Sequence, residues 1–177
     1  MVLLLCLATI IGGCGWHLRG SQTLAVSLPP VYVEFHDVSG ELRRELTQVL
    51  TAAEVSLVEQ AGEAGLVLTL HDEQRGRRVL AVDNTGRVSE YELQYTLAFS
   101  VRDDAGQMLI PRDSIVQRRD YRFDESQVLA KTEEENKLFD FMRRMSIQAL
   151  MRRLHTINAG AQADMPAPSD ADPQDAD

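Results

Sequence analysis

The chain has 177 residues, 44% hydrophobic and 25% charged, which is the composition of a single globular domain rather than of a disordered or fibrous protein. Its formal net charge is -9, so it lacks the basic character of a nucleic-acid-binding protein, and nucleic acid is not an expected partner. Two cysteines are too few for a disulfide framework or a four-thiolate zinc site.

The first element in chain order is an apolar block over residues 2–11, in which only Thr9 is polar. A membrane-spanning helix needs about 20 apolar residues, so the block fits the hydrophobic region of a secretory signal, although no Lys or Arg precedes it. Its ending, Ile11-Gly12-Gly13-Cys14, is typical of a bacterial lipobox. We therefore expect a signal peptide over residues 1–13 and lipidation of Cys14; a buried Cys14 after an ordinary core strand is the alternative.

The next segments predict a strand, a helix and a short strand. Alternating side chains predict a half-buried strand over residues 31–35. Ser39 is a good N-cap, and apolar residues follow it at helical spacing, so a helix is expected over residues 39–53. Residues 55–58 are consistent with a short additional strand.

A strand meander is predicted after that helix. One strand should run over residues 66–82, with a bulge or bend at Gly76, and end at a turn over residues 83–86. Strict alternation over residues 91–101 is the clearest pattern in the chain, and it indicates one packed face and one polar face. A hairpin turn at residues 103–106 should lead into a partner strand over residues 109–123.

The last predicted elements are a long amphipathic helix over residues 133–157 and an acidic tail. Residues 161–177 carry five Asp and no basic residue, so this segment is expected to be disordered. The pattern predicts one α+β domain over residues 14–160: about four strands in a largely antiparallel sheet, with two helices packed on one face.

Catalytic and metal-binding motifs are not evident. The four histidines, His17, His36, His71 and His155, do not have the spacing of a metal site, and there is no nucleophile elbow or phosphate-binding glycine loop. The acidic run over residues 133–135 is explained by the positive end of a helix dipole. We expect no enzymatic activity, no metal and no cofactor.

Arginine dominates the basic residues, because only Lys131 and Lys137 among the 18 are lysines. Arg118 and Arg119 are adjacent in a predicted strand, so they should face opposite sides of the sheet. Guanidinium groups bind phosphate well, which makes the strand arginines candidates for anion binding. The arginine pairs on the last helix are more simply explained as a solvated face.

Several motifs resemble the LptE family of lipopolysaccharide-assembly lipoproteins, and they occur in the family's order over nearly the whole chain after residue 13. These motifs are Cys14-Gly15-Trp16-His17-Leu18-Arg19-Gly20, Glu90-Tyr91-Glu92-Leu93, Arg119-Asp120-Tyr121-Arg122-Phe123, Val128-Leu129-Ala130-Lys131 and Met151-Arg152-Arg153-Leu154. The family fold, two helices on a four-stranded sheet, agrees with the fold expected from periodicity.

The resemblance implies an outer-membrane lipoprotein that assists lipopolysaccharide assembly, binds lipopolysaccharide, and acts as plug and partner of the large β-barrel LptD. It would be lipid-anchored, with its domain on the periplasmic side or inside the barrel lumen. Two alternatives remain: a structural outer-membrane scaffold without affinity for lipopolysaccharide, and a periplasmic hydrolase or sugar-binding enzyme.

Site residues follow from the pattern and the resemblance together. We expect the lipopolysaccharide phosphates to contact Lys131, with Arg87, Arg119 and Arg122 as further candidates. We expect the barrel to contact the polar face of the alternating strand through Glu92, Gln94, Thr96 and Ser100. The alternatives are that this face simply meets water and that Lys131 pairs with Glu134 or Glu135 on the surface.

Overall fold

The computed structural model describes residues 28–163, which form a four-stranded sheet and two long helices. The sheet order is β1-β2-β3-β4; β1 pairs with β2 in parallel, and the other two pairings are antiparallel. The strands and helices in chain order are β1 (Val31–Asp37), α2 (Gly40–Ala52), β2 (Leu66–Val82), β3 (Val88–Asp103), β4 (Met108–Arg122) and α3 (Val128–Ala163).

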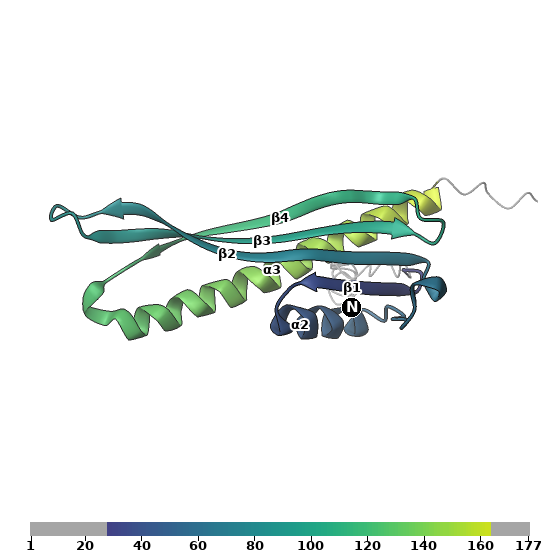
Figure 1. Cartoon of the computed structure of the whole chain (residues 1–177), viewed down its shortest axis with the longest axis horizontal. Coiled ribbons are helices and arrows are strands. Elements are labelled where there is room, and N and C mark those ends of the chain that lie inside the picture. Colours follow the sequence, from purple (N-terminus) through teal and green to yellow (C-terminus); the bar gives the residue numbers. More distant parts are fainter. Residues whose placement is uncertain (1–27, 164–177) are drawn as a thin grey trace, which may run out of the picture.

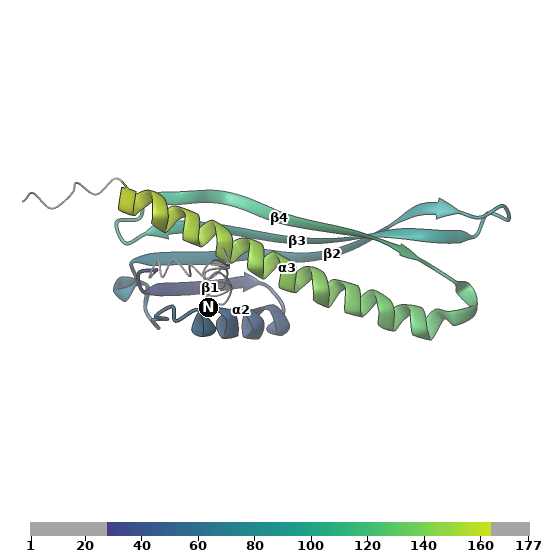
Figure 2. The same cartoon turned by 180° about the vertical axis from the view of Figure 1, so that it is seen from behind.

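Both helices cover the same face of the sheet, as Figures 1 and 2 show from opposite sides. The predicted α+β class, with a largely antiparallel sheet and two helices on one face, is therefore confirmed. β1 pairs only with the first part of β2, up to Asp72, so the second part of β2 pairs with β3 alone. The β2–β3 hairpin consequently extends as a long arm, and its turn lies at the same end of the molecule as the start of α3 (Figures 1 and 2).

The core lies between the sheet and the helices, and β3 contributes the side chains that the alternating pattern predicts. Every second residue of β3 over positions 93–101 is fully buried, namely Leu93, Tyr95, Leu97, Phe99 and Val101. Residues three and four apart on a helix share one face, which explains why Leu42, Leu46 and Leu50 of α2 pack into the same core. Arg143 of α3 is also buried, and it forms a bidentate pair with Glu45 of α2 at 2.9 and 3.1 Å.

The predicted N-cap of the first helix is confirmed. The side chain of Ser39 accepts a hydrogen bond from the backbone N–H of Leu42 at 3.1 Å, which satisfies one of the unpaired donors of the first turn. The backbone N–H of Ser39 itself donates to Glu73 of β2 at 2.7 Å. The start of α2 is therefore attached to the sheet by a carboxylate.

Two local predictions were wrong. Residues 55–58 do not form a strand; the segment makes only a single bridge, between Leu57 and Val31. Gly76 is neither bulged nor out of register, since it pairs with Gln94; the irregularities of β2 lie between Leu70 and Asp72 and again over residues 79–82. A bulge depends on the pairing strand as well as on the local residues, so glycine alone does not locate it.

The last helix begins earlier and ends later than predicted. It starts at Val128 because Asp124 and the short 3-10 turn of Glu125–Gln127 lead directly into it, and it continues to Ala163. Its end therefore lies three residues beyond the predicted domain boundary at residue 160. The remainder of the predicted acidic tail, the predicted signal peptide and Cys14 lie outside the described residues.

Candidate functional site

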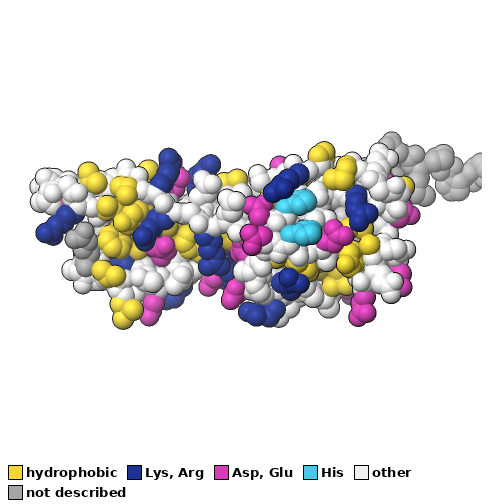
Figure 3. Space-filling view, in the orientation of Figure 1, with side chains coloured by type: hydrophobic (Ala, Val, Ile, Leu, Met, Phe, Trp, Pro, Cys, Tyr) yellow, Lys and Arg dark blue, Asp and Glu magenta, His cyan; other side chains and the backbone are white. Residues whose placement is uncertain are grey.

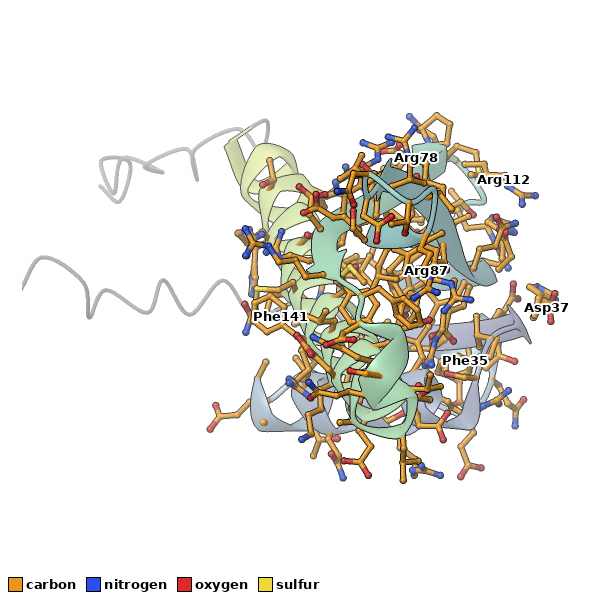
Figure 4. All side chains as sticks on the ribbon, turned by 90° about the vertical axis from the view of Figure 1, so that its left-hand side faces the viewer. Phe35, Asp37, Arg78, Arg87, Arg112 and Phe141 are labelled. Carbon is orange, nitrogen blue, oxygen red and sulfur yellow. The ribbon has the colours of Figure 1, made fainter. Side chains whose placement is uncertain are left out.

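The end of the molecule formed by the β2–β3 turn carries Arg87 in an ordered loop. The carboxylate of Asp83 accepts hydrogen bonds from the hydroxyl of Thr85 at 2.7 Å and from the backbone N–H groups of Thr85 and Arg87 at 2.8 and 3.0 Å. These bonds lower the pKa of Asp83, and the bond from the Thr85 hydroxyl has the largest effect. Gly86 supplies the positive φ that the turn requires. In the end-on view of Figure 4, Arg87 lies near the centre of this end.

Arg87 and Arg122, two of the four predicted phosphate-binding residues, line one pocket of about 430 Å³ at this end. Its other lining residues are Asp83, Val88, Ser89, Phe123, Asp124 and Ser126. Asp124 accepts hydrogen bonds from the hydroxyl and the N–H of Ser126 at 2.7 and 2.9 Å, which lower its pKa. Both carboxylates of the pocket are thus engaged by donors of their own turns, and two guanidinium groups share the same opening.

Lys131 lies in the first turn of α3, beside an aromatic cluster of Tyr91, Tyr121 and Phe123. Its ammonium nitrogen is 5.6 Å from the ring centre of Tyr121 and 2.8 Å from Glu134. The hydroxyl of Tyr121 donates to the backbone carbonyl of Lys131 at 2.8 Å, which fastens the start of the helix to β4. The surface pair with Glu134 that we considered as an alternative is therefore present, with the Lys131 side chain 19% exposed.

Arg119 lies apart from the other three candidates. It pairs in register with Leu93 on the helix-facing side of β4, and its guanidinium group is 5.4 Å from the ring centre of Phe141. Phe141 follows Lys131 by ten residues of α3, about 15 Å at 1.5 Å per residue. As expected for neighbours in a strand, Arg118 faces the other side, where it donates to Gln94 at 3.3 Å.

Exposed apolar side chains gather at the same end as Arg87, Arg122 and Lys131. They come from the end of β2 and the start of α3: Val79, Leu80, Val82, Val128 and Leu129, with exposures of 53%, 44%, 58%, 54% and 78%. Figure 3 shows hydrophobic surface at this end with basic side chains around it. Sequence reasoning treated both segments as ordinary packed elements; their position next to a turn or a helix start was the only available signal.

The predicted partner face is the side of the sheet that the helices leave uncovered. Arg78 holds Glu92 with two hydrogen bonds of 2.7 and 3.0 Å, and Gln94 donates to Thr96 at 3.3 Å. Ser100 differs from these residues because it is only 7% exposed and lies 2.9 Å from the ring nitrogen Nε2 of His71. Any contact of Ser100 with a partner would therefore involve His71 as well.

We expect NMR titration to give His71 a pKa below 6.5. Burial is the main cause, followed by the positive charge of Arg112 and that of His36, whose ring stacks on His71 with centroids 6.2 Å apart; Asp72 and Glu34 act in the opposite direction. Unfolded histidine titrates near 6.5, so the unfolded chain takes up the proton first, and folding stability should fall as the pH drops below 6.5.

Arg112→Gln should raise the pKa of His71, whereas Arg78→Gln, which removes a charge elsewhere on the same face, should leave it unchanged. An unaltered titration in the Arg112 variant would contradict this account of the electrostatics.

Within residues 28–163, no group of three or more His, Cys, Asp or Glu side chains is placed to hold a metal ion. No helix in this part of the chain has the length and apolarity needed to cross a membrane.

Comparison with known proteins agrees with this fold. The sequence pattern of the family "LptE: Lipopolysaccharide-assembly" matches residues 22–154. The LPS-assembly lipoprotein LptE of Pectobacterium atrosepticum is 28% identical over 167 residues, covering 90% of this chain and 87% of the relative. That of Yersinia pestis is 30% identical over 166 residues, covering 90% of this chain and 77% of the relative.

Two solved structures show the same arrangement of elements. The rare lipoprotein B of Shewanella oneidensis superposes with a TM-score of 0.68 at 27% identity, covering 75% of this chain and 98% of its own. The lipoprotein B of Nitrosomonas europaea gives 0.66 at 26% identity, covering 84% and 94%. The family match spans both helices and all four strands up to Leu154, so this chain belongs to the LptE family of lipopolysaccharide-assembly lipoproteins.

Proposed function

We propose that this chain is an outer-membrane lipoprotein that assists lipopolysaccharide assembly, binding lipopolysaccharide at the hairpin end while partnering a large LptD-like β-barrel. The observation that carries the proposal is that cations and exposed apolar side chains meet at one end of an elongated domain. Lipopolysaccharide is itself an amphiphile, with phosphates on a sugar core and several acyl chains. The proposal assigns no catalytic turnover to the chain.

The phosphate contacts are assigned to Arg87, Arg122 and Lys131, with Arg119 as a more distant contributor. A charge-assisted hydrogen bond is worth about 1.5–3 kcal/mol, roughly twice a neutral one. Glu134, the partner of Lys131 in its ion pair, is 51% exposed, and a pair at the surface is worth only about 0–1 kcal/mol, so a phosphate can replace the glutamate at little cost.

The acyl chains are assigned to the apolar surface of Val79, Leu80, Val82, Val128 and Leu129. Each CH₂ group transferred from water to such a surface contributes about 0.8 kcal/mol, so even partial burial of one chain adds usefully to the phosphate contacts. A purely structural scaffold has no need for these exposed side chains beside a pocket that holds two guanidinium groups, which favours lipopolysaccharide binding over the scaffold alternative.

The barrel contact is assigned to the uncovered sheet face of Glu92, Gln94, Thr96 and Ser100. Barrel lumens are lined by polar side chains, so a polar plug surface suits them better than a second hydrophobic layer. Pull-down of the acylated protein in mild detergent tests this directly, because a partner barrel should be recovered in comparable amount. If the protein binds lipopolysaccharide but no barrel is recovered with it, the barrel partnership is wrong and only the lipopolysaccharide-binding part of the proposal is kept.

Thr96→Arg combined with Ser114→Arg should reduce the recovered barrel at least tenfold while the circular dichroism spectrum stays unchanged. We chose Ser114 rather than Ser100 because Ser100 is only 7% exposed, whereas Ser114 is exposed on the same face, where it pairs with Ala98. The matched control is Thr47→Arg with Thr51→Arg on the exposed side of α2. Undiminished recovery with the first pair would mean that the face simply meets water.

Lipid attachment at Cys14 completes the proposal, with residues 1–13 as signal, residues from 14 to the end of α3 at Ala163 as domain and residues 164–177 as acidic tail. Two or more acyl chains anchor a protein far more firmly than one. Intact-mass measurement of the membrane-extracted protein should give a chain that begins at Cys14 and carries lipid. An unmodified Cys14, or a retained signal, would contradict this part.

A further inference from the structure

Gly76 lies in the middle of β2, where the backbone conformation does not require a glycine. It pairs in register with Gln94, and the positive-φ glycines of the described chain are Gly86 and Gly106. Glycine weakens a strand interior because it loses more conformational freedom than other residues and has no side chain to pack. A larger residue would therefore serve the strand at least as well.

The space around Gly76 is open on the sheet face that the helices leave uncovered. A Cβ atom added there would meet nothing nearer than the backbone oxygen of Gln94, at 3.9 Å. The missing side chain instead leaves a hollow of about 230 Å³ in this face. Its polar walls include Gln74, Arg78, Glu92, Gln94 and Thr96, so three of the four residues assigned to the barrel contact line it.

The walls of this Gly76 hollow are held by a chain of hydrogen bonds. Arg78 binds Glu92 through two nitrogens, Arg118 donates to Gln94 at 3.3 Å, and Gln94 donates to Thr96 at 3.3 Å. Arg78 and Arg118 both lie against Glu92, at 2.7 and 3.8 Å, and Asp120, which pairs in register with Glu92, acts on Arg78 as a second negative charge. The two positive and two negative charges of this region therefore balance, so a charged side chain from a partner would gain little here. The amide of Gln94 and the hydroxyl of Thr96 remain to form hydrogen bonds with a partner, and their positions are fixed before binding.

We infer that the Gly76 hollow receives one uncharged polar side chain, such as Asn, Gln, Ser or Thr, from the inner wall of the barrel partner. The inference rests on the proposed barrel partnership. Inward side chains of a barrel alternate along each strand and are polar, so they can enter a hollow in a facing polar sheet as a knob enters a hole. Shape and hydrogen bonding together then set the register of the plug in the lumen.

Gly76→Val in the full acylated chain tests the inference, because valine suits a strand and fills the hollow. We expect at least a tenfold loss of recovered barrel, with unchanged melting temperature and unchanged lipopolysaccharide binding. Gly76→Ser, which fills less of the space, should lose less. Gly62→Val is the matched control, since a Cβ there meets nothing within 4 Å and the residue lies in the short helical turn Ala61–Glu63.

The outcomes separate this inference from the function on which it rests. If the wild-type chain recovers no barrel, the proposed partnership fails. If wild type and Gly76→Val recover equal barrel, the partnership stands and the hollow is not a docking point. If Gly76→Val lowers the melting temperature and weakens lipopolysaccharide binding together with the recovery of barrel, the inference is also overturned, because the substitution would then be acting on folding.

Discussion

Replacing Arg87 and Lys131 together with aspartate is expected to lower the affinity for lipopolysaccharide about a hundredfold or more. Each charge-assisted contact to phosphate contributes about 1.5–3 kcal/mol, and 1.4 kcal/mol corresponds to a factor of ten. The two residues reach the hairpin end from different elements, the β2–β3 turn and the first turn of α3, so one ligand contacting both would bridge them. Fluorescence titration with purified lipopolysaccharide measures the effect.

The matched control is Arg44→Asp with Arg152→Asp, which changes the net charge equally on exposed helix positions away from the hairpin end. The control should retain nearly wild-type affinity, and both double variants should keep the wild-type melting temperature. Equal weakening by the two pairs would show a general effect of charge. No weakening by the first pair would place the ligand elsewhere.

Glu73→Ala is expected to destabilise the fold by about 3 kcal/mol. The Glu73 carboxylate accepts the hydroxyl hydrogen of Tyr95 at 2.8 Å and the backbone N–H of Ser39 at 2.7 Å, and its side chain is only 4% exposed. Burial, followed by the nearby charge of Glu73, raises the pKa of Tyr95, so its hydroxyl stays protonated and donates. Removing the acceptor leaves a fully buried hydroxyl unpaired and detaches the start of α2 from the sheet.

Urea unfolding of the two variants Glu73→Ala and Glu135→Ala makes the comparison. Glu135, on α3, makes an ion pair with Arg77 of β2 at 2.9 Å, but that arginine is 46% exposed, so the loss of the pair should cost no more than about 1 kcal/mol. Tyr95→Phe completes a cycle, since its cost should largely disappear in the Glu73→Ala background. Similar costs for both glutamates would contradict the special role of Glu73.

Local patterns determined most of the fold. Period-two alternation located β3 because successive side chains of a strand face opposite sides, and helical spacing after Ser39 located α2. Turn residues located both hairpins, where Gly86 and Gly106 have the positive φ that such turns require. The LptE motifs were equally local, which explains why the family could be identified before the structure.

Features that depend on pairing between distant segments could not be obtained in this way. The irregularity between Leu70 and Asp72 changes which residues of β2 face the helices, so that Glu73 reaches the core beside Tyr95. The sequence of residues 66–76 alone does not predict that change, because a bulge is defined by the register between two strands. The same reasoning explains why Gly76 was mistaken for the bulge.

For the candidate site too, some features were predictable from the sequence and others depended on the tertiary structure. Sequence reasoning selected Arg87, Arg122, Lys131 and Arg119 and anticipated the pairing of Lys131 with Glu134, which lies one helical turn away. Only the tertiary structure decided that Arg87 and Arg122 share a pocket, that Arg119 lies with Phe141 instead, and that apolar side chains stay exposed beside the pocket. Spacing along the chain dictates which residues share a face of one element, but which faces meet is decided by the long-range packing of sheet and helices.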